Sequence, residues 1–101
     1  MRLSELFEEI LERPVKYVGT HSLDRILCFI EGYKLALLRN HLPLEDDLRP
    51  FDGWVAKRFQ IASSHNWANI ISFMSVGDDR EAISLARELW AEFKTERAGK
   101  R

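Results

Sequence analysis

The sequence predicts an all-α fold, a compact single-domain bundle of about five helices. Apolar residues recur at helical spacings of three and four along nearly the whole chain, and no segment shows the alternation typical of a strand. Residues that cap helices, and prolines, fall between these periodic segments. With 101 residues, 46% of them apolar and 31% charged, the chain fits one domain with a single core. We expect one helical domain over 1–101, with its core at about 4–97 and a basic tail at 98–101.

A short first helix is predicted near the N-terminus. Ser4 can cap a helix that continues to about Glu12. One face of this helix is apolar and the other is acidic, which is the pattern of a helix that covers a core. Pro14 then ends the helix, and we expect residues 15–19 to be extended or to form a turn.

The second predicted helix, over 22–40, has the clearest periodicity in the chain. Ser22 can serve as its N-cap. Gly32 lies inside it, where glycine costs about 1 kcal/mol relative to alanine. We expect this glycine to permit close packing of another helix. The residues predicted to face the core are Leu23, Ile26, Leu27, Ile30, Tyr33, Leu37 and Leu38.

A polar connection and a third helix follow. Residues 40–50 contain two prolines and a run of three acidic residues, which is typical of a solvated connection. Asp52 can cap a short third helix that contains Trp54 and Phe59.

Two further helices complete the predicted bundle. Ser63 or Ser64 can open the fourth, whose apolar residues surround its axis, so we expect it to be central. Gly77 is suited to end it. Asp78 followed by Glu81 has the form of a capping box, and predicts a last helix from 79 to about 97.

The sequence offers little for catalysis or for cofactors. The four candidate soft ligands are not paired at metal-binding spacing, so we expect no metal site and no cofactor; they are His21, Cys28, His41 and His65. Ser64 directly precedes His65, but neighbours at a helix start point to different sides and do not form a catalytic dyad. No glycine-rich phosphate loop is present in the sequence. We therefore expect a protein that is not an enzyme.

Charge and cysteine content restrict the partners and the compartment. Fifteen basic residues face sixteen acidic ones, so bulk charge does not favour binding to nucleic acid or to anionic lipid. The apolar stretches are too short to span a membrane. Cys28, the single cysteine, fits a reducing cytoplasm. The alternative that stays open is a DNA-associated regulator or adaptor, although a helix beginning at Asn66 would offer DNA mainly apolar residues.

Protein recognition is the remaining class of function. Eleven aromatic residues are more than a small helical core needs, and aromatic side chains often anchor interfaces. The sequence also concentrates acidic residues at Glu45, Asp46 and Asp47, with Asp52 just beyond. We predict that these four residues bind a protein partner with a basic surface. A homodimer is also possible, since exposed aromatic residues could pair with a second copy.

The order of motifs resembles a group of small, all-helical bacterial proteins. The matching residues, spread over 15–93, are Tyr17-Val18-Gly19, Phe29 to Tyr33, Phe51 to Val55, Arg58-Phe59, Asn66-Trp67-Ala68, Leu89-Trp90 and Phe93. Many members of this group are uncharacterised, and some resemble immunity (antidote) proteins encoded beside polymorphic toxins. The resemblance implies a non-catalytic protein that binds and neutralises a cognate toxin. It carries over no contact residue.

Overall fold

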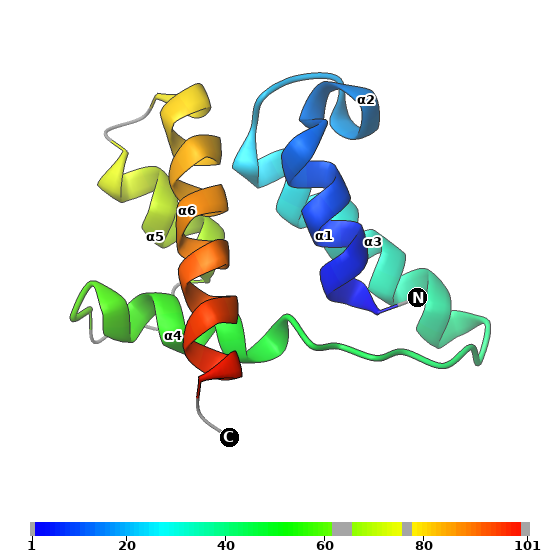
Figure 1. Cartoon of the computed structure of the whole chain (residues 1–101). Coiled ribbons are helices and arrows are strands. Elements are labelled where there is room, and N and C mark those ends of the chain that lie inside the picture. The colour runs from blue at the N-terminus through cyan, green and yellow to red at the C-terminus, as the bar shows by residue number, and fades with distance from the viewer. Residues whose placement is uncertain (1, 62–65, 76–77, 100–101) are drawn as a thin grey trace.

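The computed structural model describes residues 2–61, 66–75 and 78–99, and these residues form six helices and no strand (Figure 1). The predicted all-α bundle is therefore confirmed, with one short helix more than expected. The helices are α1 (Leu3–Glu12), α2 (Pro14–Val18), α3 (Leu23–Arg39), α4 (Arg49–Arg58), α5 (Trp67–Met74) and α6 (Asp79–Ala98). None of these helices combines the length and apolar character that a membrane span requires.

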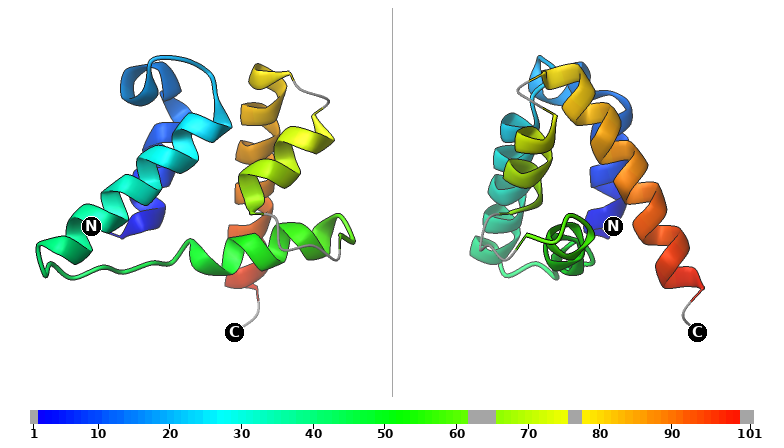
Figure 2. Two further views of the ribbon diagram at one scale, coloured as in Figure 1. Left: turned by 180° about the vertical axis from the view of Figure 1, so that it is seen from behind. Right: turned by 90° about the vertical axis from the view of Figure 1, so that its left-hand side faces the viewer.

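The helices form two groups joined across the core. α1 and α2 pack against each other, and α2 packs against α3, on one side of the molecule (Figures 1 and 2). α5 and α6 pack together on the other side, and α4 runs across the foot of the bundle beneath them. α5 contacts α3, α4 and α6, but α6 contacts α1, α3, α4 and α5. Phe73 of α5 is 78% exposed, so this helix is not the central one that the sequence predicted.

Aromatic rings from four helices build the centre of the core. Phe7 of α1 is fully buried, and its ring centroid lies 5.0 Å from that of Trp67 and 5.1 Å from that of Trp90. Phe51 of α4 lies 5.2 Å from Trp90 and 5.3 Å from Phe93. Such edge-to-face and tilted pairs add to the free energy gained by burial. Trp67 and Trp90 are therefore core residues, while Trp54 is partly buried.

The structure corrects the predicted boundaries near the N-terminus. α1 begins at Leu3, so Ser4 lies inside the helix and is not its N-cap. Residues 15–19 are not extended, because Pro14 opens α2 as its first residue, where its fixed φ suits a helix start. Gly19 ends α2 with a φ of 81°, a conformation that glycine adopts without strain.

Two later boundaries also differ from the prediction. α4 begins at Arg49, so Asp52 lies in its first turn and does not cap it. α5 begins at Trp67, behind an N-cap formed by Asn66, and not at Ser63 or Ser64. Those two serines, together with Gly77, lie outside the described residues. Asp78 caps α6 as predicted, since its carboxylate accepts the N–H of Glu81 at 3.0 Å.

The second half of α3 departs most from expectation. All the buried residues of this 17-residue helix, Leu23, Ile26 and Ile30, lie in its first half. Leu38, which was predicted to face the core, is 64% exposed. A Cβ added to Gly32 would have no atom of the described chain within 4 Å. Gly32 therefore does not pack closely against another helix of the same chain, and that prediction is wrong. The C-terminal half of α3 projects from the bundle instead.

Candidate functional site

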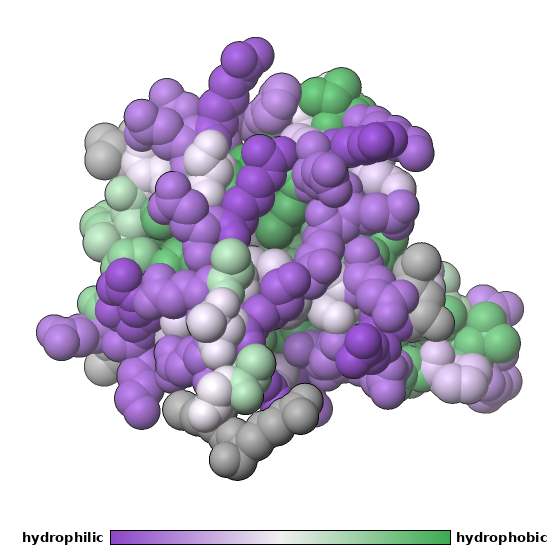
Figure 3. All heavy atoms as spheres, viewed as in Figure 1, coloured by the Kyte–Doolittle hydropathy of each residue, from purple (hydrophilic) through white to green (hydrophobic). Residues whose placement is uncertain are grey.

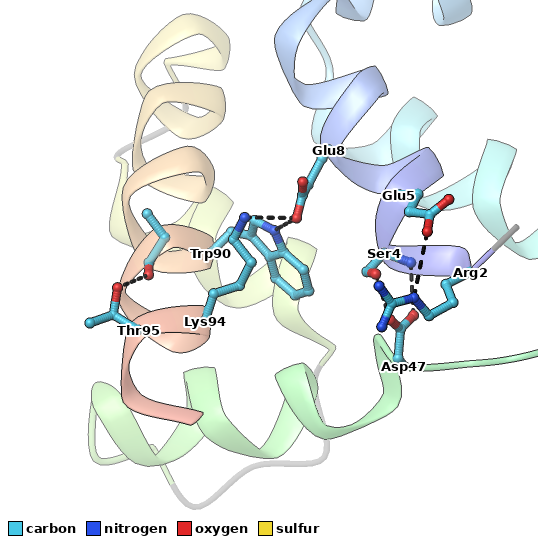
Figure 4. A network of polar contacts seen from close by, with 9 residues as sticks. Arg2, Ser4, Glu5, Glu8, Asp47, Trp90, Lys94 and Thr95 are labelled. Carbon is cyan, nitrogen blue, oxygen red and sulfur yellow. Dashed lines mark hydrogen bonds and ion pairs between the residues drawn. The ribbon is translucent and has the colours of Figure 1, made fainter. Parts of the chain in front are cut away.

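Asp47, one of the four acidic residues predicted to bind a partner, holds the start of α1. Its Oδ1 accepts the N–H of Ser4 at 2.8 Å, and its Oδ2 accepts the Ser4 hydroxyl (Figure 4). The carbonyl of Glu45 accepts the N–H of Leu3 at 3.2 Å. The first amides of a helix lack partners within it, so the segment before α4 caps α1 from 43 residues away.

Asp52 likewise binds a backbone amide at the start of a helix, in this case α5. Its Oδ1 accepts the N–H of Trp67, the first residue of α5, at 2.8 Å. The carboxylate also lies at the N-terminal end of α5, where the helix dipole interacts favourably with negative charge. Asp52 therefore fixes α4 against α5, and this use of its carboxylate competes with contact to a partner.

Asp46 and Glu45 differ in exposure. Asp46 forms an ion pair with Lys34 of α3 at 3.0 Å, and its side chain is only 20% exposed. The Glu45 side chain is 68% exposed, and its nearest cation is Arg2 at 3.9 Å. Of the predicted acidic set, Glu45 is thus the residue whose carboxylate is most accessible to a protein partner.

A groove between α1 and α6 lies beside this acidic segment. It has a volume of about 510 Å³. Two core aromatic residues, Trp90 and Phe93, form its apolar part. Its polar lining carries three acidic and three basic side chains, and comprises Arg2, Ser4, Glu5, Glu8, Asp47, Lys94 and Arg97. The groove therefore places charged side chains of both signs above two aromatic rings that are only 5% and 4% exposed.

Glu8 joins the two helices that line this groove. Its Oε2 accepts the indole N–H of Trp90 at 2.8 Å and lies 2.9 Å from the Lys94 ammonium (Figure 4). Partial burial acts to raise the pKa of Glu8, but the hydrogen bonds from Trp90 and Lys94 and the charge of Lys94 outweigh it, so the pKa lies below 4.5. Glu8 is thus a paired, ionised carboxylate near neutral pH, and not a general acid.

The described structure also bears on the candidate metal ligands and the candidate DNA-binding helix. Within residues 2–61, 66–75 and 78–99, no group of three or more His, Cys, Asp or Glu side chains is placed to hold a metal ion. Cys28 is exposed on α3. The Ser64–His65 pair lies outside the described residues. α5 buries Trp67, Ala68, Ile70 and Ile71 and contains no lysine or arginine, so it lacks the features of a DNA-recognition helix.

The sequence did not predict the groove, because its walls come from segments about 80 residues apart. A weak signal was present in α6, where Trp90 and Lys94 are four residues apart and therefore share a face. Nothing in the sequence joined that face to Glu8 of α1. Comparison of the chain with protein-family models, curated proteins and solved structures gives no match.

Proposed function

We propose that this chain acts by binding another protein, without catalysis of its own, and that the groove between α1 and α6 is the contact surface. The observation that carries the proposal is a groove between two helices whose charged side chains are in part held in place before any partner binds. Glu8 is fixed by Trp90 and Lys94, and Arg2 lies 3.5 Å from Glu5. Side chains ordered before binding lose less conformational entropy when a partner docks.

The rim of the groove carries mixed charge, and its exposed carboxylates, together with the neighbouring Glu45, favour a partner that presents basic side chains to them. Glu45 and Glu5 are the exposed carboxylates of this face, with side chains 68% and 52% exposed. Like the acidic patch predicted from sequence, they would meet lysine or arginine of the partner and speed its association. The narrower proposal, which rests on the resemblance to immunity proteins, is that the partner is a bacterial toxin encoded by the neighbouring gene and neutralised in the cytoplasm.

Co-expression with the product of the neighbouring gene tests this proposal. We expect the wild-type chain to restore growth and to co-purify with that product. The double variant Glu5→Lys/Glu45→Lys should bind at least about tenfold more weakly, because two attractive contacts become repulsive. Glu88→Lys, which makes one such charge reversal at an exposed residue of α6 outside the groove lining, should bind normally.

Two outcomes would contradict the proposal. If the neighbouring product neither inhibits growth nor binds the wild-type chain, the antidote function is wrong. If binding occurs but the groove variant and the Glu88→Lys control bind equally well, the contact surface lies elsewhere. The alternative of a DNA-associated regulator stays a prediction, tested by salt-dependent binding to duplex DNA.

A further inference from the structure

The outward face of α3 carries apolar side chains that the fold leaves uncovered. Leu35 and Leu38 are 52% and 64% exposed, and their spacing of three residues places them on one face. Leu42, just after the helix, is also exposed, and its N–H donates to the carbonyl of Leu37 at 2.9 Å. Figure 3 shows hydrophobic residues at the end of the molecule where α3 projects. A surface of this kind marks an interaction site more often than isolated exposed residues do.

Gly32 is an independent observation on the same part of α3. It lies three residues before Leu35, near the middle of the helix, and nothing in the described part of the chain lies within 4 Å of the Cβ it lacks. Glycine in a helix interior costs about 1 kcal/mol relative to alanine. Packing within the chain does not account for that cost. A missing side chain on an exposed face does allow the backbone of another molecule to approach.

The charges on this face favour a second copy as that molecule. Glu31 and Arg39 are both exposed, and each lies four residues from Leu35, on opposite sides along the helix. If two α3 helices pair antiparallel about an axis at Leu35, Glu31 of each copy lies level with Arg39 of the other. Antiparallel pairing also sets the helix dipoles in opposition, which is their favourable arrangement. The face is therefore complementary to itself.

We propose that α3 is a homodimer interface, in which the projecting halves of two α3 helices pack antiparallel around Leu35. Gly32 lets the helices approach, and Leu35 and Leu38 supply the apolar contact. In the left view of Figure 2, α3 is visible along its whole length with no other helix in front of it. Two half-helices form a contact smaller than a standard interface, so we expect dissociation in the micromolar range.

Sedimentation equilibrium measures this association directly. The mass of the wild-type chain should rise with concentration from 11.8 kDa toward twice that value. Leu35→Lys should remain monomeric, whereas Phe73→Lys, an equal change at an exposed residue of α5, should dimerise normally. Gly32→Gln should weaken the dimer at least tenfold, and Gly53→Gln should not, although Gly53 of α4 is equally free of neighbours. A wild-type chain that stays monomeric at about 1 mM, or a Leu35→Lys variant that dimerises normally, overturns the proposal.

Charge exchange tests the antiparallel orientation. Glu31→Arg and Arg39→Glu should each weaken the dimer, because each places like charges level with each other. The double variant should recover the wild-type affinity. In addition, oxidation should not link two Cys28 residues, which an antiparallel pair separates by about 21 Å along the axis. Leu35→Cys in a Cys28→Ser background should form a linked dimer. A double variant weaker than both single variants, or rapid linkage through Cys28, overturns the antiparallel arrangement.

Discussion

Helices α1 and α3 differ in how their ends are held. No side chain caps α1 from the residue before it; Asp47 binds the amide of Ser4 instead. At the other end, the Arg87 guanidinium of α6 donates to the carbonyl of Leu11 at 2.7 Å and to that of Glu12 at 3.1 Å. Both ends of α1 therefore depend on segments that are distant in sequence.

α3 is capped by its own neighbours. The Ser22 hydroxyl accepts the N–H of Arg25 at 3.3 Å. At the other end, His41 adopts a φ of 54° and its N–H donates to the carbonyl of Leu38, which with the bond from Leu42 to Leu37 closes the helix. α3 buries three of its 17 residues, whereas α1 buries five of ten. A helix that is closed by local residues can extend beyond the core, and the exposed half of α3 does so.

The largest loss of stability is expected when Phe7, the residue that joins α1 to the core, is replaced. Phe7→Ala removes a fully buried ring that contacts Trp67 and Trp90, and should lower the free energy of unfolding by about 3–5 kcal/mol. The free energy of unfolding is measured by denaturant titration, with tryptophan fluorescence as the signal. Phe73→Ala, which truncates a ring that is 78% exposed on α5, should change stability by less than about 0.5 kcal/mol. Similar losses in the two variants would refute the role given to Phe7.

Removal of the Asp47 carboxylate, which caps α1 from a distant segment, should cause the next largest loss of stability. Asp47→Ala removes two hydrogen bonds to Ser4, and we expect a loss of about 1–2 kcal/mol. Hydrogen exchange should accelerate in the first turn of α1 more than in α3. Ser22→Ala, which removes the local cap of α3, should instead accelerate exchange in the first turn of α3. If Asp47→Ala leaves the exchange of α1 unchanged, this carboxylate does not cap the helix in solution.

Replacement of Gly32 by alanine should raise the free energy of unfolding, in contrast to the two substitutions above. Gly32→Ala meets no neighbour within the chain, so it should raise the free energy of unfolding by about 0.5–1 kcal/mol at a dilution where the chain is monomeric. Gly19→Ala is the contrasting variant, because the φ of 81° at Gly19 is strained for alanine, and it should destabilise the protein. A destabilised Gly32→Ala monomer would show that this position packs within the chain.

The smallest effect is expected in the pH dependence of the contact between α1 and α6. The pKa of Glu8 is lower in the folded chain than its ordinary value of 4.5. Its contribution to stability is therefore complete above pH 4.5 and is lost as pH falls through the lower, folded pKa. Unfolding of Glu8→Gln should depend less on pH in this range than that of the wild type, while Glu88→Gln should retain the wild-type dependence. Equal pH dependence in Glu8→Gln and the wild type would mean that Glu8 is not held by Trp90 and Lys94 in solution.

Features of the fold encoded within a few residues could be predicted from the sequence. Ser22 and Asp78 lie directly before their helices, and both cap them as predicted. Asp47 and Asp52 could not be assigned in the same way, because the amides they bind lie 43 and 15 residues away. The composition of the acidic run alone did not distinguish a carboxylate that holds a helix from one that remains largely exposed, as Glu45 does.

The contact between Glu8 and Trp90 joins residues separated by 82 positions. During synthesis, α1 is therefore made well before the residues of α6 that cover it and close its C-terminal end. Until Arg87 and Trp90 leave the ribosome, the part of α1 that α6 covers stays exposed to solvent or to chaperones. α3 does not depend on a distant segment in this way. The residues that close its two ends, Ser22 and Leu42, directly flank it in the sequence and are made with it. We therefore expect α3 to form on the ribosome before α1 is complete. α1 should be completed only after α6 has been made.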